Sequence, residues 1–138
     1  MEKQNKNGDK IRFAFFGTSA FSVHVLNALA EKSLTPTHIV TFPDKPQGRN
    51  LLPMPSPVKI WAAKNSVPCV EKESLRDKES KKPLPELLQT FREFKSDVFV
   101  VASYGNIIPQ EVLDIPVHKT LNVHPSLLPK LRGASPLQ

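Results

Sequence analysis

The chain has 138 residues, 39% of them hydrophobic and 23% charged, and this composition is typical of one soluble globular domain. Nineteen Lys and Arg against thirteen Asp and Glu give a formal charge of +6, which fits either a polyanionic partner or simply a well-solvated basic surface. No membrane helix or secretory signal is recognisable, and the single cysteine, Cys69, excludes an internal disulfide, so we expect a cytoplasmic protein without a membrane partner.

Alternating strand and helix patterns follow a polar lead-in that we expect to be flexible, residues 1–10. Short apolar runs predict strands at 11–18, 37–42, 67–71, 97–103 and 119–126. Helical spacing predicts helices at 20–32, after an N-cap at Ser19, and at 84–94. Shorter helices are expected at 58–65, after Pro57, and within 104–115, whereas the charged stretch 71–82 is expected to be a solvated connection. The alternation predicts an α/β fold with a doubly wound, mainly parallel sheet.

Between the second strand and the next helix, residues 43–57 contain five prolines. Proline excludes both a helix and a central strand, so this segment is expected to be a long loop. Long loops in compact domains are often functional, although a rigid surface loop with incidental charges is the plainer interpretation of this composition.

Gly17 follows the first strand and precedes a helix, an arrangement that invites a nucleotide-binding interpretation. The turn reads GTSAFS and lacks the second and third glycines of the dinucleotide fingerprint, and no phosphate loop is present. We therefore expect Gly17 to serve a tight turn rather than to cradle a pyrophosphate.

Asn122 and His124 form the strongest candidate site. Residues two apart in a strand point to the same face, and ligands in open α/β sheets bind at the carboxyl ends of strands. An Asn amide can donate to a developing oxyanion, and a His can carry a proton near neutral pH. Spacing alone leaves open a pair that merely satisfies backbone groups. The four histidines lie far apart without acidic neighbours, so no metal site is expected.

The stretch LNVHPSLLPKLRGASPLQ resembles the folate-dependent formyltransferases, which share an Asn-x-His-x-Ser-Leu-Leu-Pro core. The opening FAFFGTSAFS, the loop FPDKPQGRNLLPMPSPVK and the ending RGASPLQ are similar to the branch of that family that acts on methionyl-tRNA. The resemblance covers residues 11–138. It implies a Rossmann-like N-terminal catalytic domain and transfer of a formyl group from 10-formyltetrahydrofolate to the α-amino group of methionyl initiator tRNA, in translation initiation, without a metal.

The resemblance also implies roles for individual residues. Asn122 would bind the formyl oxygen as it becomes an oxyanion, and His124 would assist proton transfer as the amine attacks. The folate would contact Tyr104, Gly105, Asn106, Ile107, Ile108 and Pro109, together with Ser126, Leu127, Leu128 and Pro129. Without the resemblance, residues 104–109 would be interpreted as an ordinary loop that enters a helix. The proline-rich loop would meet the acceptor end of the tRNA, with Lys45, Arg49 and Lys59 suited to phosphates.

The family's third catalytic residue, an Asp that orients the histidine, would lie beyond Gln138, as would the C-terminal β-barrel domain. We therefore expect the chain to be the N-terminal part of a monomeric enzyme, incomplete at its C-terminus and with little activity alone. Two alternatives stay open: a formyltransferase that acts on an amino-sugar nucleotide, and a noncatalytic remnant that binds folate or tRNA.

Overall fold

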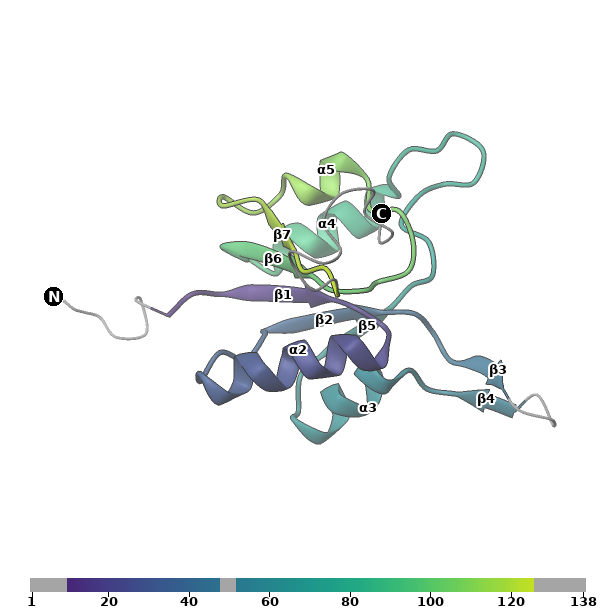
Figure 1. Cartoon of the computed structure of the whole chain (residues 1–138). Coiled ribbons are helices and arrows are strands. Elements are labelled where there is room, and N and C mark those ends of the chain that lie inside the picture. The colour runs from purple at the N-terminus through teal and green to yellow at the C-terminus, as the bar shows by residue number, and fades with distance from the viewer. Residues whose placement is uncertain (1–9, 48–51, 126–138) are drawn as a thin grey trace, which may run out of the picture.

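The structure, a computed structural model, describes residues 10–47 and 52–125. Figure 1 shows a central sheet between two layers of helices, and a two-stranded hairpin that projects away from the sheet. Within the described ranges, no helix reaches the length and apolarity that a membrane span requires. The elements in chain order are β1 (Phe13–Phe16), α2 (Ala20–Glu31), β2 (His38–Thr41), β3 (Lys45–Gln47), β4 (Leu52–Met54), α3 (Pro57–Lys64), β5 (Cys69–Glu71), α4 (Pro85–Glu93), β6 (Val98–Val101), α5 (Gln110–Leu113) and β7 (Thr120–Asn122).

The central sheet has the strand order β5-β2-β1-β6-β7, and every neighbouring pair in it is parallel. From β1 the chain moves outward through β2 and β5, and it then returns to the other side of β1 to form β6 and β7. This reversal of strand order creates a crevice at the carboxyl ends of the strands, which is where such sheets bind ligands. The predicted doubly wound, mainly parallel fold is confirmed, with strands somewhat shorter than the apolar runs.

The two faces of the sheet carry separate hydrophobic clusters, and β1 contributes to both because successive side chains of a strand alternate. Phe13 and Phe15 pack with Leu26 of α2 and Trp61 of α3 on one face. The other face of β1 packs against α4, where Leu87 and Phe91 are buried as the helical spacing predicted. Both faces are thus covered, as a parallel sheet requires.

Gly17 is required by close packing rather than by an unusual backbone angle. A Cβ atom at this position would lie 2.7 Å from the carbonyl oxygen of Ala102, and 2.7 Å from both Phe15 Cε1 and Ser22 Oγ. The backbone N–H of Gly17 donates to the carbonyl of Val40 at 3.1 Å. The glycine therefore lets the end of β1 fit between β2 and β6, which is a different reason from the predicted tight turn.

The segment 43–57 lies outside the central sheet, as predicted, but the part that the structure describes contains two paired strands, which the prediction of a long loop did not include. Strands β3 and β4 pair antiparallel, with Pro46 opposite Pro53. Neither proline has an N–H, so this pair can only occupy a position whose backbone groups point away from the ladder, and the neighbouring pairs carry the hydrogen bonds. Proline thus kept this segment out of the central sheet but did not prevent a separate hairpin, which we call the arm (residues 42–56).

The charged connection between β5 and α4 is only partly solvated. Its residues are mostly exposed, but Leu75 is fully buried against the cluster that contains Phe16 and Phe91. Arg76 and Pro83 form an isolated antiparallel bridge that closes the connection into a loop. The burial of this one apolar residue in a run of charges was not predicted by the charge pattern.

His38, at the start of β2, should make the stability of the fold depend on pH. Its ring stacks on Phe94 with centroids 4.0 Å apart, and burial, followed by the charge of Arg12, lowers its pKa below 6.5. The unfolded chain therefore binds a proton at higher pH than the folded chain does, so stability is lost as the pH falls below 6.5. We expect the free energy of unfolding, measured with urea, to decrease less between pH 7.5 and pH 5.5 for His38→Phe, which keeps the ring stack, than for the parent. Equal decreases would contradict this account.

Candidate functional site

The carboxyl ends of β6 and β7 bring the two predicted site residues together. β7 ends at Asn122, and the N–H of Val123 still donates to the carbonyl of Val101 at 2.7 Å. The Val123 side chain packs against the hydrophobic core, so its two neighbours point the other way. Asn122 and His124 are both exposed and share one side of the chain, as the strand spacing predicted.

The two side chains contact each other directly. Asn122 Nδ2 lies 3.4 Å from His124 Nε2, which is a long hydrogen bond. An amide nitrogen can only donate, so in this arrangement Nε2 accepts and the imidazole proton is assigned to Nδ1. A neutral histidine of this tautomer presents a lone pair at Nε2, the atom that faces the amide.

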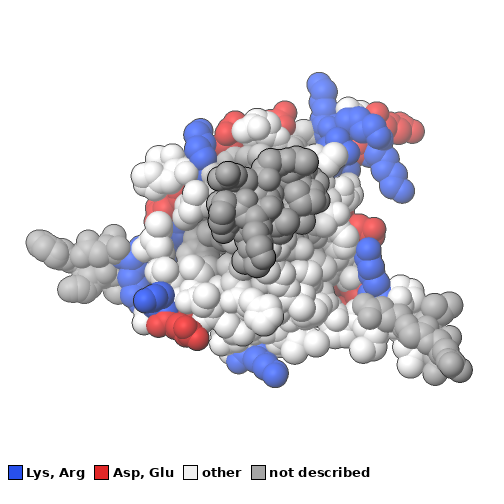
Figure 2. All heavy atoms as spheres, in the orientation of Figure 1, with Lys and Arg blue, Asp and Glu red and all other residues white. Residues whose placement is uncertain are grey.

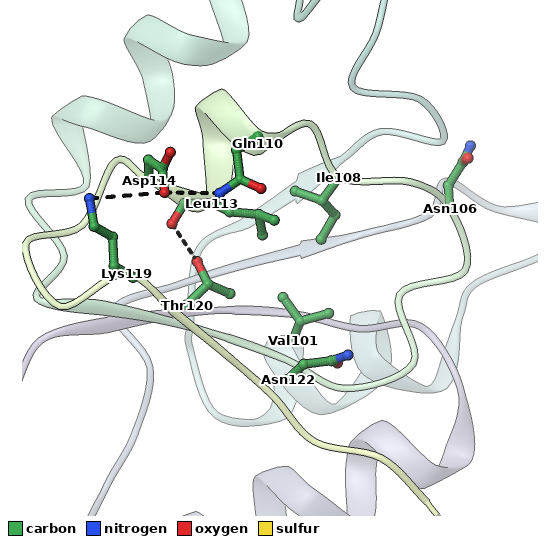
Figure 3. A pocket seen from close by; sticks show the side chains of 9 residues that line it. All are labelled: Val101, Asn106, Ile108, Gln110, Leu113, Asp114, Lys119, Thr120 and Asn122. Atoms are coloured by element: carbon green, nitrogen blue, oxygen red, sulfur yellow. Dashed lines mark hydrogen bonds and ion pairs between the residues drawn. The ribbon is translucent and has the colours of Figure 1, made fainter. Parts of the chain in front are cut away.

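Asn122 stands on the wall between two hollows. The first, which we call the α5 hollow, has a volume of about 340 Å³ and lies between β6, β7 and α5 (Figure 3). Figure 3 shows Asn122 at one end of it and Asp114, bonded to Gln110 and Lys119, at the other. It is lined by Val101, Asn106, Ile108, Gln110, Leu113, Asp114, Lys119, Thr120 and Asn122.

The second hollow, which we call the Tyr104 hollow, shares Val101, Asn106 and Asn122 with the α5 hollow and has a volume of about 610 Å³. Its walls are the loop after β6 and the residues that follow β7, including His124. His124 borders only this hollow, whereas Asn122 borders both. A ligand in either hollow would therefore reach Asn122, and a ligand in the Tyr104 hollow would also reach His124.

The loop after β6 is held in place by its own side chains. The Tyr104 hydroxyl donates to the carbonyl of Lys72, and Asn106 Nδ2 donates to the carbonyl of Glu73 at 2.8 Å. Burial, followed by the negative charge of Glu73, raises the pKa of Tyr104, so its hydroxyl remains a donor at neutral pH. Ser103 and Gly105 have positive φ angles of 61° and 106°, which make the sharp turn that exposes this loop beside Asn122.

The predicted folate-binding residues that the structure describes line both hollows, but not in equal number. Asn106 and Ile108 line the α5 hollow, and Tyr104, Gly105, Asn106 and Ile107 line the Tyr104 hollow. Pro109 is the N-cap of α5 and lines neither hollow. Residues 126–129 lie outside the described residues.

Sequence reasoning missed most of the α5 hollow. Thr120 precedes Asn122 by two positions on the same strand, and Val101 is the register partner of Asn122 on β6, so strand alternation could have identified both. The other missed residues are Gln110, Leu113, Asp114 and Lys119, which come from α5 and the turn after it. Their contribution depends on how α5 packs, for which the sequence contains no signal.

Two of the predicted phosphate-binding cations, Lys45 and Lys59, lie within the described residues, and both are already paired with carboxylates. Lys45 Nζ lies 3.6 Å from a Glu73 carboxylate oxygen and 4.6 Å above the centre of the Phe42 ring. Lys59 Nζ lies 2.8 Å from Asp44 Oδ1 and 3.2 Å from Glu71 Oε2. Arg49 lies outside the described residues. In Figure 2, Lys and Arg side chains are scattered around the rim of the visible face rather than gathered in one patch.

No cluster of three or more His, Cys, Asp and Glu side chains suited to a metal ion occurs among residues 10–47 and 52–125. Cys69 lies in β5, away from the hollows, and burial, followed by the charge of Glu71, raises its pKa to about 11. At neutral pH this cysteine is therefore a protonated thiol and a poor nucleophile.

Comparison with known proteins identifies one family. The model described as "Formyl transferase" matches residues 10–138. A methionyl-tRNA formyltransferase from Thermotoga neapolitana is 41% identical over 128 residues, which is 93% of this chain and 39% of that protein. A protein of the same name from Thermus thermophilus is 46% identical over the same share of each chain. The chain thus spans about two fifths of the length of these relatives.

Solved structures with a similar fold carry other names. Glycinamide ribonucleotide transformylase 1 from Geobacillus kaustophilus superimposes with a TM-score of 0.59 at 23% identity, over 91% of this chain and 63% of that one. A formyltetrahydrofolate deformylase from Pseudomonas putida KT2440 gives a TM-score of 0.58 at 18% identity, over 91% and 41%. At these identities the likeness concerns the fold alone.

Proposed function

The chain belongs to the formyl transferase family, and from this premise we propose that residues 11–138 form the N-terminal catalytic domain of a monomeric methionyl-tRNA formyltransferase. In this proposal a formyl group passes from 10-formyltetrahydrofolate to the α-amino group of methionyl initiator tRNA. The observation that carries it is the contact between Asn122 and His124 on the wall between two hollows. A transfer reaction needs such a place, because the donor and the acceptor must meet at one carbon atom.

Asn122 and His124 have complementary tasks in this reaction. As the amine attacks the formyl carbon, the formyl oxygen gains negative charge, and Asn122 Nδ2 donates a hydrogen bond to it. The hydrogen bond from Asn122 to His124 opens as the amine enters, and His124 Nε2 then accepts the proton that the attacking nitrogen loses. The bond between the donor nitrogen and the formyl carbon then breaks, and the proton passes to the donor nitrogen, so the reaction consumes no further reagent.

The α5 hollow suits the flat ring system of the formyl donor. Val101, Ile108 and Leu113 supply apolar walls, and Gln110 and Thr120 add polar groups to the lining. Binding sites for small molecules commonly combine apolar walls with a few polar groups in this way. Its volume of about 340 Å³ accommodates a bicyclic ring, and a formyl group at the open end would lie beside Asn122. The donor supplies the activated formyl group.

The Tyr104 hollow is then the entrance for the acceptor amine, because His124 borders it and does not border the α5 hollow. The base of the arm stands beside this entrance: Phe42 packs edge-on against Tyr104 with ring centroids 5.1 Å apart. An arm in this place can contact the tRNA whose acceptor end enters the hollow. Lys45 and Arg49 are its cationic residues, and Lys45 would exchange its long ion pair with Glu73 for a phosphate.

Filling the α5 hollow should block the formyl donor. Thr120→Phe places a ring in the hollow, so we expect the dissociation constant of a stable donor analogue, 10-formyl-5,8-dideazafolate, to rise about tenfold or more. Isothermal titration calorimetry on the 138-residue chain measures it. Val117→Phe, at an exposed position that does not line the hollow, is the matched control and should bind normally. Equal affinities for both variants would show that the donor does not bind in this hollow.

A further inference from the structure

The arm is attached to the domain only near its base. Figure 1 shows β3 and β4 standing clear of the sheet and of the helices. Leu52 and Met54 of β4 remain 59% and 47% exposed, so the described strands bury little apolar surface that could fix their direction. An isolated two-stranded hairpin is marginally stable in water, and contacts at its base must therefore determine where it points.

Lys59 makes the most extensive of these contacts. It lies in the first turns of α3, yet its Nζ atom reaches Asp44, which immediately precedes β3, at 2.8 Å, and Glu71 at the end of β5, at 3.2 Å. Hydrogen bonds to Asp44 and then to Glu71 raise the pKa of Lys59, so the ammonium remains charged through the neutral range. One side chain thus joins the arm, a helix and a strand of the central sheet.

The charges of this group argue against a phosphate contact. Two carboxylates surround one ammonium, so the three side chains together carry one net negative charge. A phosphate that approached Lys59 would have to displace one carboxylate while the other remained nearby. Lys59 is therefore poorly suited to the phosphate-binding role that the sequence suggested.

We propose that Lys59 is a positioning residue that sets the direction of the arm, and does not itself bind RNA. Two neighbouring contacts hold the base of the arm. Ser56, which caps α3, lies 2.9 Å from Thr41 through the two hydroxyl oxygens, and Phe42 packs against Tyr104. These contacts fix the two chain segments that enter and leave the arm. The ion pairs of Lys59 with Asp44 and Glu71 add a third connection, between the arm and β5. Surface ion pairs contribute little stability, so the consequence concerns orientation rather than folding.

The first test measures the direction of the arm and does not depend on the proposed function. Spin labels at Leu52→Cys and Glu31→Cys, in a chain with Cys69→Ala, report the distance from the arm to the end of α2 by double electron–electron resonance. We expect one narrow distance distribution for the parent and a broad one for Lys59→Met. Lys59→Arg, which keeps the charge and can bind both carboxylates, should restore the narrow distribution. Lys64→Met, at the other end of α3, is the control. A narrow distribution in Lys59→Met would overturn the inference.

The second test rests on the proposed function and separates positioning from direct contact. A hairpin RNA with the acceptor stem of the initiator tRNA is titrated with each variant, without spin labels, at several salt concentrations. We expect Lys59→Met to weaken binding by about fivefold at most, which corresponds to the small energy of surface ion pairs. The slope of log affinity against log salt should stay unchanged, because the loosened arm still makes its phosphate contacts in the complex and only the cost of ordering it is added. A slope reduced by about one would instead mean that Lys59 neutralises a phosphate, which contradicts the inference. A loosened arm with unchanged RNA affinity would refute the RNA role of the arm and leave its positioning by Lys59 intact.

Discussion

Asn122→Ala is expected to slow formyl transfer by about 10²–10³-fold, the usual effect of removing one hydrogen-bond donor to a developing oxyanion. The assay uses a polypeptide in which residues 1–138 are followed by the remaining part of the Thermus thermophilus relative, with labelled formyl donor and methionyl-tRNA. Affinity for the analogue of the formyl donor should change much less than the rate. The hydrogen bond from Asn122 strengthens only as negative charge develops on the formyl oxygen.

Asn122→Asp is a second test at the same position, since it preserves the shape of the side chain and removes the N–H donor. We expect it to be at least as slow as Asn122→Ala, because a carboxylate repels an oxyanion. Transfer within about threefold of the parent rate in both variants would mean that Asn122 does not stabilise the reacting oxygen, whatever its distance from His124.

Gly17→Ala is expected to destabilise the fold by about 3 kcal/mol, toward the upper end of the usual cost of overpacking a core. The added methyl group would meet the Ala102 carbonyl oxygen at 2.7 Å, and that oxygen belongs to the backbone and cannot rotate away. It also accepts a hydrogen bond from Ser22 Oγ, which fixes the start of α2 against the end of β6. Urea unfolding followed by circular dichroism measures the loss.

Ala63→Gly, at an exposed position in the last turn of α3, provides the scale for this measurement, since glycine costs at most about 1 kcal/mol there. Gly17→Ala should exceed it clearly. A smaller effect than that of Ala63→Gly would mean that β1 and β6 separate to admit a methyl group, and that the close packing at the switch between these strands is not required.

The central sheet could be predicted from the sequence because its signals are local and agree with one another. The runs in β1 and β6 are almost entirely apolar, as strands buried on both faces must be, and the helix that contains Leu87 and Phe91 shows its buried face in its spacing. Such an apolar strand must be buried whichever strand it pairs with, so the local sequence is enough to predict it. The strand order was not predicted, because the preference for right-handed crossovers does not determine the point at which the chain returns to the other side of β1.

The arm and the connection before α4 could not be predicted, because each depends on a partner that the local sequence does not reveal. Proline correctly excluded the arm from the central sheet, but the pairing of Pro46 with Pro53 requires a particular register between two strands. Leu75 is buried among charged neighbours because the loop returns to the core at that point. Neither the register of the two prolines nor the burial of Leu75 follows from the secondary-structure propensities of the residues.

The candidate site was predictable to a similar extent. Strand alternation was enough to place Asn122 and His124 on one side of the chain, and the structure places them in contact. The walls of the α5 hollow, such as Leu113 and Lys119, come from tertiary packing and carried no signal. Lys59 shows what a charge alone leaves out: the sequence suggested an RNA contact but could not reveal the two carboxylates that lie beside its ammonium group.

The most direct test of the account is a crystal structure of the 138-residue chain with 10-formyl-5,8-dideazafolate. We expect the ring system in the α5 hollow, between Val101, Ile108 and Leu113, with the formyl oxygen within hydrogen-bond distance of Asn122 Nδ2 and the formyl carbon facing the Tyr104 hollow. A ligand bound elsewhere, for example in the groove between α2 and α3, or a formyl group turned away from Asn122, would contradict it.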